Sequence, residues 1–108
     1  MTDKIIVFVT CESKDQADRI AQTVVQERLA ACVNVLPGVS SCYVWKGKLT
    51  WSDEVMLLIK TTLGRFKQLH SRVRAEHSYE LPEIVAVEIE DAEQKYLDWI
   101  DEAVGGSV

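Results

Sequence analysis

The stretch "ACVNVLPGVSSCYVWKGKLTWSDEVMLLIKT", residues 31–61, decides the fold. Apolar and polar side chains alternate along both of its halves, which is the pattern of a β-strand with one covered face. Lys46-Gly47-Lys48 separates the two halves, and a short glycine-containing segment of this kind predicts a tight hairpin turn. The sequence therefore predicts one long antiparallel hairpin with about fifteen residues in each arm.

Arms of that length are too long for a compact domain, since they span roughly 45–50 Å and ordinary strands span about 17–20 Å. The tip must protrude or curl, and Pro37-Gly38 is the place where we expect a bend or bulge. A monomer rarely leaves a large apolar ribbon in water, so we expect other copies of the chain to cover it with closed cyclic symmetry. The alternative is a ribbon that folds back over its own sheet. The expected interface residues are Tyr43, Val44, Trp45, Leu49 and Trp51.

The segment before the hairpin predicts a strand and a helix. Lys4 to Thr10 is almost continuously apolar, which is typical of a buried strand. Ser13 and Gln16 then form a capping-box pattern, and apolar residues recur at helical spacing as far as Leu29. We therefore expect a helix that begins after Ser13.

The segment after the hairpin predicts two more helices and one more strand. The expected elements are a helix capped by Thr61 or Thr62 with Phe66, Leu69 and Val73 on its apolar face, a strand from Ile84 to Ile89, and a helix that begins at an Asp91 and Gln94 capping pair and ends at Gly105. The resulting βαββαβ order with a C-terminal helix predicts an α+β ferredoxin-like sandwich with an extended central hairpin. Its length fits a single domain over residues 1–108.

Composition excludes several classes of protein. The net charge of −5 argues against nucleic-acid binding, which needs a basic face, and the chain lacks the aromatic strings of an RNA-recognition domain. Apolar runs are far shorter than the roughly 20 residues of a membrane span, so no membrane partner is expected. The odd count of three cysteines disfavours a secreted disulfide scaffold, and the apolar run near the N-terminus is too short for a signal peptide. We expect a cytoplasmic protein.

No catalytic motif is present in the sequence. It contains no Walker phosphate loop, no G-x-S-x-G and no CxxC, and with two histidines a catalytic triad has little to draw on. We therefore expect a protein that is not an enzyme.

Four strings in the sequence resemble the CutA divalent-cation tolerance family. They are "ERLAACVNVLPGVSSCYVWKGKL" (27–49), "EVMLLIKTT" (54–62), "HSYELPEIVAVEI" (77–89) and "YLDWI" (96–100). The resemblance covers nearly the whole chain in the right order. It implies a homotrimer similar to the PII signalling proteins, in which neighbouring hairpins extend one another's sheets, and a role in tolerance of copper or another divalent metal.

The resemblance also implies metal ligands. Candidate ligands in the family are a cysteine that ends the first strand and a histidine at the turn after the second helix, which here are Cys11 and His77. Some members have two successive histidines there, and this chain has Glu76 in the first of the two places. A carboxylate is a harder ligand than imidazole, so a preference for copper should weaken. No metal is expected to be needed for folding.

Two of these residues have a structural alternative. The amides at the start of the first helix would favour a thiolate at Cys11, but a free cysteine is also often a small buried apolar side chain. His77 is either a ligand or a residue that caps the end of the second helix, where a partly positive ring favourably meets free carbonyls. The sequence leaves both alternatives open.

A cleft between subunits is the second candidate site. A cleft with convergent polar groups is the usual place for a small-molecule site. The residues expected to line it are Trp45, Lys60, Tyr79, Glu80, Pro82 and Glu83, with Arg72 beside them. The alternative function is thus a PII-like signalling or scaffold trimer that binds a small anion or a protein in these clefts, without a specific metal.

Overall fold

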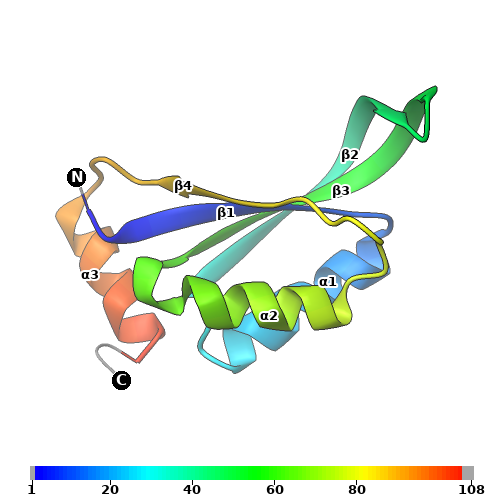
Figure 1. Ribbon diagram of the computed structural model, residues 1–108. Coiled ribbons are helices and arrows are strands. Elements are labelled where there is room, and N and C mark those ends of the chain that lie inside the picture. Colours follow the sequence, from blue (N-terminus) through cyan, green and yellow to red (C-terminus); the bar gives the residue numbers. More distant parts are fainter. Residues whose placement is uncertain (1, 106–108) are drawn as a thin grey trace.

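The computed structural model describes residues 2–105. Its elements are β1 (Lys4–Cys11), α1 (Lys14–Gln26), β2 (Cys32–Trp45), β3 (Lys48–Thr62), a 3₁₀ turn η1 (Leu63–Arg65), α2 (Phe66–Glu76), β4 (Ile84–Glu88) and α3 (Gln94–Ala103). The strands form one sheet in the order β2-β3-β1-β4, and all neighbours are antiparallel. Helices α1 and α2 cover one face of this sheet (Figure 1). This arrangement confirms the predicted ferredoxin-like sandwich.

The core lies between the sheet and helices α1 and α2. Every second residue of β1 and of the lower part of β3 points to the helices, because side chains alternate across a strand. These side chains meet the apolar stripes of the two helices and are almost completely buried. The main members of this core are Ile5, Val7, Val9, Ala17, Ile20, Val24, Val55, Leu57, Ile59, Leu69 and Val73.

Helix α3 packs at the end of the sheet near the N-terminus (Figure 1). Ile100 and Val104 form a small separate cluster with Ala31. Lys4 Nζ lies 2.9 Å from Asp101 Oδ2 and so links α3 to β1. The helix has its C-cap at Val104, and Gly105 follows with a left-handed φ of 83°, as the glycine at this place predicted.

The hairpin of β2 and β3 is as long as the sequence predicts. Its pairing runs from Cys32 and Lys60 at the base to Trp45 and Lys48 at the tip. The register shifts between Leu36 and Val39, which confirms the bulge expected at Pro37-Gly38. Lys46 and Gly47 both have positive φ, at 51° and 81°, which suits the tight turn of a twisted hairpin.

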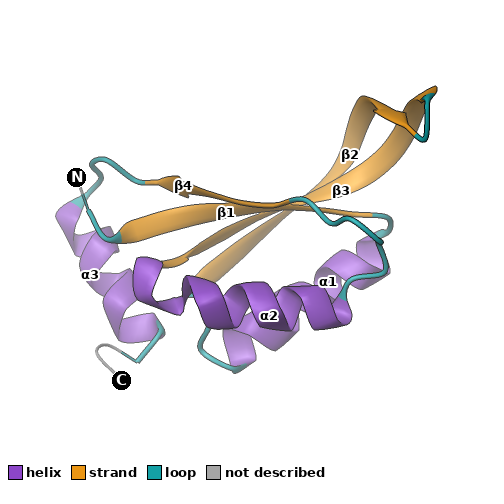
Figure 2. Ribbon diagram, viewed as in Figure 1, coloured by secondary structure: helices purple, strands orange, loops and turns teal. Residues whose placement is uncertain are grey.

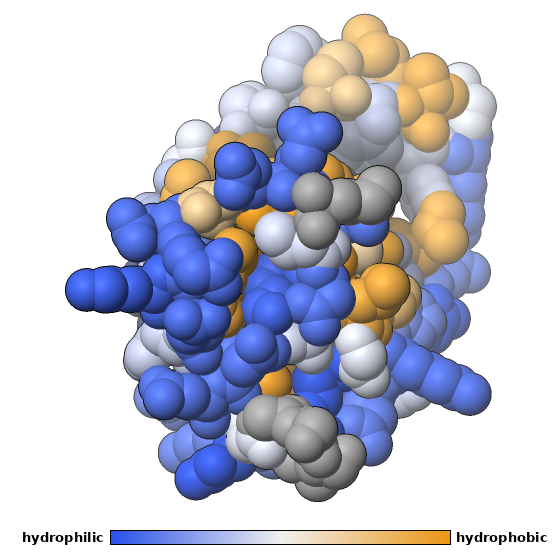
Figure 3. All heavy atoms as spheres, turned by 90° about the vertical axis from the view of Figure 1, so that its left-hand side faces the viewer, coloured by the Kyte–Doolittle hydropathy of each residue, from blue (hydrophilic) through white to orange (hydrophobic). Residues whose placement is uncertain are grey.

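The upper part of the hairpin leaves the body of the molecule instead of folding back over its own sheet. Figure 2 shows the two strands continuing past β1 and bending away from the helices, and the molecule is 44 Å long as a result. Val44, Leu49 and Trp51 are 68%, 72% and 66% exposed there. Apolar side chains gather on this distant end in Figure 3, whereas the face nearest the viewer is mostly hydrophilic.

Two of the predicted helix starts differ in detail. Ser13 Oγ accepts from the Gln16 amide at 3.1 Å, which confirms the N-cap of α1. The reciprocal half of the capping box is absent within residues 2–105, because Gln16 Oε1 is buried without a hydrogen-bond partner. Thr62 precedes η1 without a side-chain capping bond, and Thr61 Oγ1 instead donates to the Leu29 carbonyl oxygen at 2.7 Å.

The prediction that Asp91 caps the last helix is wrong. Glu93 is the N-cap of α3, and its carboxylate accepts from the Lys95 amide at 3.4 Å. The carboxylate of Asp91 bonds to the Ala92 amide outside the helix. Several acidic residues compete for this role over three or four positions, so the local pattern does not choose between them.

Across residues 2–105, no helix has the length and apolar character needed to cross a bilayer.

Candidate functional site

His77 joins the end of α2 to the end of β1. Its backbone N–H donates to the Arg74 carbonyl, so it is the residue that ends the helix. Its ring Nδ1 accepts from the Tyr79 N–H at 3.1 Å, and Nε2 lies 2.7 Å from the Thr10 carbonyl oxygen. A carbonyl can only accept, so Nε2 carries the proton in this arrangement and both ring nitrogens are satisfied.

This geometry favours the structural interpretation of His77, with one correction. The expected contact between the ring and the free carbonyls of its own helix is replaced by a bond to Thr10 of β1. The ring therefore holds the turn against the sheet rather than stabilising the end of α2. A metal ion at either nitrogen would have to displace a hydrogen bond that the chain already makes.

Tyr79 continues this link to β3. Its hydroxyl donates to Glu54 Oε2 at 2.7 Å, and its ring centroid lies 4.8 Å from that of His77. Burial and the neighbouring Glu54 carboxylate raise the pKa of the Tyr79 hydroxyl well above its usual range. A chain of hydrogen bonds thus runs from Thr10 through His77 and Tyr79 to Glu54 and fixes residues 77–79 against two strands.

Cys11 is a buried thiol and not an activated one. Its side chain is completely buried among the residues of the core. Burial, and then the negative charge of Glu54, raises the pKa of the Cys11 thiol to about 11. The effect of burial opposes that of the amides at the start of α1, so of the two alternatives the structure favours the small apolar side chain.

The three predicted metal ligands are not brought together. Glu76 faces α1, where its carboxylate accepts from Thr23 Oγ1 at 3.4 Å and lies 3.7 Å from Arg72 Nη1. Over residues 2–105, no three His, Cys, Asp or Glu side chains are grouped so that they could hold a metal ion. The raised pKa of the thiol and the hydrogen bonds at both nitrogens of His77 also oppose metal binding, so the described residues as arranged do not fit a metal.

A groove of about 680 Å³ lies under the hairpin tip, and we call it the tip groove. Residues of the upper hairpin form one wall, and the segment after His77 forms the other. Its lining residues are Thr10, Ser41, Cys42, Tyr43, Val44, Trp45, Glu54, Ser78, Tyr79, Glu80, Leu81 and Glu83. Four of the six predicted cleft residues, Trp45, Tyr79, Glu80 and Glu83, therefore meet in one place.

Lys60 and Pro82, the other two residues predicted for the cleft, do not line this groove of the single chain. Lys60 pairs with Ile6 and Cys32 at the base of β3, at the opposite end of that strand from Trp45. Its place in the hairpin register separates it from the tip groove by most of the length of the strand. Pro82 belongs to the same segment as Glu83 but does not line the groove.

The tip groove is acidic. Its lining contains the carboxyl groups of Glu54, Glu80 and Glu83 and no Lys, Arg or His. Burial, and then the charge of Glu54, raises the pKa of the Glu83 carboxyl group. Within the single chain, an anion in this groove would meet only like charges, so these residues by themselves do not suit a small anion.

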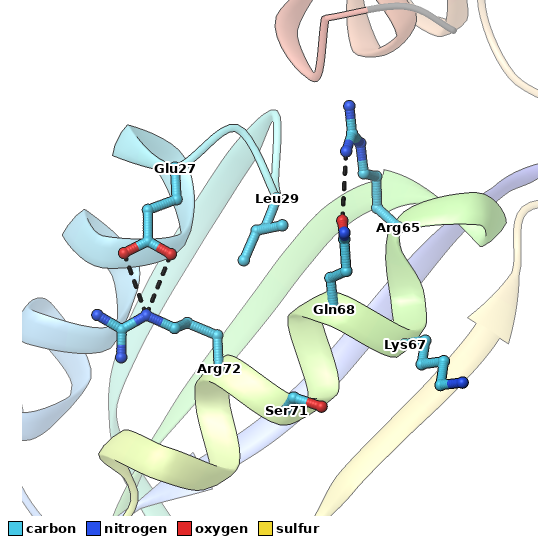
Figure 4. A pocket seen from close by; sticks show the side chains of 7 residues that line it. All are labelled: Glu27, Leu29, Arg65, Lys67, Gln68, Ser71 and Arg72. Carbon is cyan, nitrogen blue, oxygen red and sulfur yellow. Dashed lines mark hydrogen bonds and ion pairs between the residues drawn. The ribbon is translucent and has the colours of Figure 1, made fainter. Parts of the chain in front are cut away.

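A second groove, of about 640 Å³, lies between the end of α1 and the start of α2 (Figure 4). Arg72 Nε donates to both carboxylate oxygens of Glu27 at 3.1 Å. Arg65 donates to Gln68 at 3.3 Å and to the Val104 carbonyl oxygen at 2.7 Å. Figure 4 shows Lys67 pointing away from the others. Both arginines of this second groove thus already have hydrogen-bond partners, and its cationic side chains do not point to one common place.

Comparison with known proteins assigns the chain to a family. A family model described as CutA1 divalent ion tolerance protein matches residues 5–103. The chain belongs to this family. The resemblance seen in the sequence strings is therefore confirmed, and divalent-cation tolerance is the process in whose terms the family is named.

CutA proteins from distant organisms are similar to this one. A divalent-cation tolerance protein CutA of Thermus thermophilus is 46% identical over 100 residues, which are 93% of this chain and 97% of that protein. A chloroplastic protein CutA of Arabidopsis thaliana is 41% identical over 89% of this chain and 53% of its own length. The crystal structure of CutA from Xylella fastidiosa superposes with a TM-score of 0.93 at 41% identity, over 95% of this chain and 99% of that one.

Sequence reasoning missed the importance of Glu54. It is only 6% exposed, and its carboxylate accepts a hydrogen bond from the Tyr79 hydroxyl. Its negative charge contributes to the raised pKa of the Cys11 thiol and of the Glu83 carboxyl group. In the sequence it is simply the last polar residue before the apolar run Val55 to Ile59. Nothing in that pattern separates a buried carboxylate from a solvated one, because the difference arises from a tyrosine far along the chain.

Proposed function

We propose that this CutA protein acts in divalent-cation tolerance as a homotrimer, in which neighbouring hairpins cover one another's apolar residues. The observation that carries the proposal is the tip of the hairpin, where Val44, Leu49 and Trp51 are about two-thirds exposed or more in the single chain. Contiguous apolar surface of this kind marks an interface, and the unpaired edge of β2 offers hydrogen bonds to another strand. Closed cyclic symmetry satisfies every such edge, since each chain both gives and receives a hairpin.

The open face of the sheet supports the same proposal. Val85 and Val87 pair with Phe8 and Ile6, whose side chains point away from the helices, so all four share the face that α1 and α2 leave uncovered. Val85 and Val87 are both 49% exposed. A neighbouring chain that receives the hairpin on this side would bury two apolar areas at once.

The mass of the assembly tests this proposal. We expect native mass spectrometry and light scattering to give about three times the chain mass of 12.2 kDa over a wide range of concentration. Trp51→Glu places a charge in the interface and should split or strongly destabilise the trimer. Lys48→Glu changes the charge at the same tip without removing apolar surface and serves as the control. A wild-type monomer, or a Trp51→Glu protein of unchanged mass and melting temperature, would contradict the proposal.

Binding of copper or another divalent metal at Cys11 and His77 is the second candidate function. One observation favours it, because the bond from His77 to Thr10 places the ring beside the residue that precedes Cys11. The protonated thiol and the engaged nitrogens oppose it, as does the position of Glu76. The geometry therefore gives this candidate less support than the assembly.

Equilibrium dialysis separates the two candidates. Reduced protein is offered Cu(I), Cu(II) or Zn(II) against a competing chelator, because copper binds most available nitrogen and sulfur sites. The metal site predicts about one ion per chain, lost in both Cys11→Ser and His77→Ala. Metal content that is absent, or that survives both substitutions, rejects the site and leaves the trimer proposal standing.

Catalysis and cellular location complete the proposed function. We propose a role without catalysis, which turnover of a substrate by the purified protein would contradict. We also propose a cytoplasmic location, although the Arabidopsis relative is named chloroplastic, and fractionation of the source cells tests it.

A further inference from the structure

The tip groove combines negative charge with aromatic walls. Three carboxyl groups and the rings of Tyr43, Trp45 and Tyr79 belong to its lining, and no cationic side chain does. Its volume of about 680 Å³ lies within the range of small-molecule sites, roughly 300–1,000 Å³. A ligand for this groove must therefore tolerate both an acidic floor and flat apolar rings.

Glu54 carries a buried negative charge that no cation of the described residues balances. The residue is almost completely buried, since only 6% of its surface is exposed. Tyr79 holds Oε2 at 2.7 Å, whereas Oε1 makes no hydrogen bond and the carboxylate makes no ion pair within residues 2–105. Oε1 is not among the fully enclosed atoms, so it reaches the groove that Glu54 lines. A buried carboxylate without a cation is costly, and an entering positive charge would remove that cost.

Glu83 strengthens this demand for a cation. It lines the same groove, and partial burial, followed by the charge of Glu54, raises the pKa of its carboxyl group. Glu83 is exposed while Glu54 is buried, and a cation in the groove would offset the repulsion between the two carboxyl groups. This effect and the unpaired Oε1 of Glu54 point to the same kind of ligand.

The aromatic side chains narrow the class of cation. Ring faces attract guanidinium and ammonium groups, and arginine-like groups also stack on them. Lys46 Nζ already lies 5.8 Å from the centre of the Trp45 ring, near the outer limit of such contacts, although Lys46 does not line the groove. A bare divalent metal fits less well, because the described residues offer it no group of three ligands.

We propose that the tip groove binds a small organic cation, a guanidinium or ammonium compound with an apolar stem. Glu54 and Glu83 hold its charged group, and Tyr43, Trp45 and Tyr79 cover the stem. The inference deepens the proposed function and rests on it in one respect, since the groove lies beside the hairpin tip that we place at the border between two chains.

Isothermal titration with two matched compounds tests the proposal. N-acetyl-arginine amide carries a guanidinium, and N-acetyl-citrulline amide has nearly the same shape with a neutral group in its place. We expect the arginine compound to bind at least tenfold more tightly, and its binding to weaken with added salt because the contact is between charges. Equal binding of the two compounds, or no heat from either one, overturns the proposal.

Substitutions locate the site. Glu54→Gln and Glu83→Gln remove a charge but keep the size of the side chain, and the amide oxygen that Glu54→Gln introduces would still accept from the Tyr79 hydroxyl. Each should weaken binding of the arginine compound at least fivefold, whereas Glu90→Gln, on the exposed segment after β4, should leave it unchanged. An equal effect of all three substitutions, or no effect of Glu54→Gln, rejects the groove as the site.

The mass of each protein is measured in the same samples. A trimer that binds neither compound contradicts the cation site alone. A monomer that still distinguishes the two compounds contradicts the proposed assembly alone. Circular dichroism and a melting curve confirm that each variant is folded before its binding result is used.

Discussion

The base and the tip of the hairpin share one sequence pattern but have different surroundings. The base comprises residues 32–36 and 56–60, and the tip comprises residues 39–45 and 48–54, with the register shift between them. At the base, Leu57 and Ile59 are fully buried under helices of the same chain. At the tip, Leu49 and Trp51 occur in the same alternation but remain mostly exposed.

This difference shows what an alternating pattern can and cannot tell. Alternation fixes which side chains share a face of a strand, because the period of a strand is two residues. It does not say whether the cover comes from the same chain or from another one. The answer depends on how far each half of the hairpin lies from the helices. The bulge marks the point beyond which α1 and α2 no longer cover the side chains of the hairpin.

The largest effect should come from placing one charge in each half. Leu57→Asp buries a carboxylate without a partner and should cost about 4 kcal/mol or more, so we expect an unfolded chain. Leu49→Asp lies on the same strand at the exposed tip and should change the stability of the single chain by less than about 0.5 kcal/mol. Circular dichroism checks folding, and light scattering checks whether Leu49→Asp lowers the mass. A folded Leu57→Asp protein would contradict the proposed difference between the buried base and the exposed tip.

The cysteines offer a chemical comparison of the two halves. Cys42 is exposed at the tip, whereas Cys11 is buried beside the base with a pKa of about 11. At pH 8 we expect iodoacetamide to modify Cys11 at least about a hundred times more slowly, because little thiolate is present and the site is closed. Peptide mass spectrometry gives both rates.

The same experiment on Trp51→Glu sharpens the result. If the tip is covered in the trimer, the rate at Cys42 should rise in this variant while the rate at Cys11 stays the same. A rise at Cys11 instead would mean that the charge at the tip opens the core.

His77 should have a moderate effect, because it ties the wall of the tip groove to β1. His77→Ala leaves the Thr10 carbonyl and the Tyr79 amide without their partner, which should cost about 1–3 kcal/mol in the free energy of unfolding. His70→Ala, on α2 beside Phe66, is the control and should cost less. Urea denaturation measures both. The role as a structural link fails if the two substitutions have equal effects.

The smallest effect should come from the turn at the tip. Gly47 has a φ of 81°, so Gly47→Ala should destabilise the hairpin by about 1 kcal/mol. Gly64→Ala is the matched control, because its φ is not left-handed and an added Cβ would meet Thr62 Oγ1 only at 4.0 Å. The control should be neutral or slightly stabilising. Thermal melting of both variants shows whether each substitution lowers or raises the stability. A Gly47→Ala protein that is more stable than the wild type would contradict the turn geometry.

Features that depend on neighbours in the sequence were predictable. The turn at Lys46-Gly47, the bulge at Pro37-Gly38 and the cap at Ser13 each arise from the conformational preferences of a few adjacent residues. The length of the hairpin could also be read directly. These local features, taken in order, were enough for the ferredoxin-like fold.

Features that depend on distant residues were not predictable. The helix amides near Cys11 are local, but the burial that determines its pKa comes from other elements. Glu54 becomes a buried carboxylate only because Tyr79 returns to it from another part of the chain. The register of the hairpin, by contrast, places Lys60 at the base and away from Trp45 of the same chain, and the alternation in the sequence already implies this.

The bulge at Pro37-Gly38 also has a consequence for the order in which the two halves of the hairpin form. Because the register shifts there, pairing at the base does not depend on how the tip is paired. The base can therefore close at a rate that is independent of protein concentration, together with the helices that cover it. In the assembly that we propose, closure of the tip on a neighbour would be a later, second-order event, and dilution should delay it without slowing the first step. If the trimer forms as we propose, synthesis of a single chain would yield a folded but incomplete molecule, whose completion depends on how many copies the cell holds.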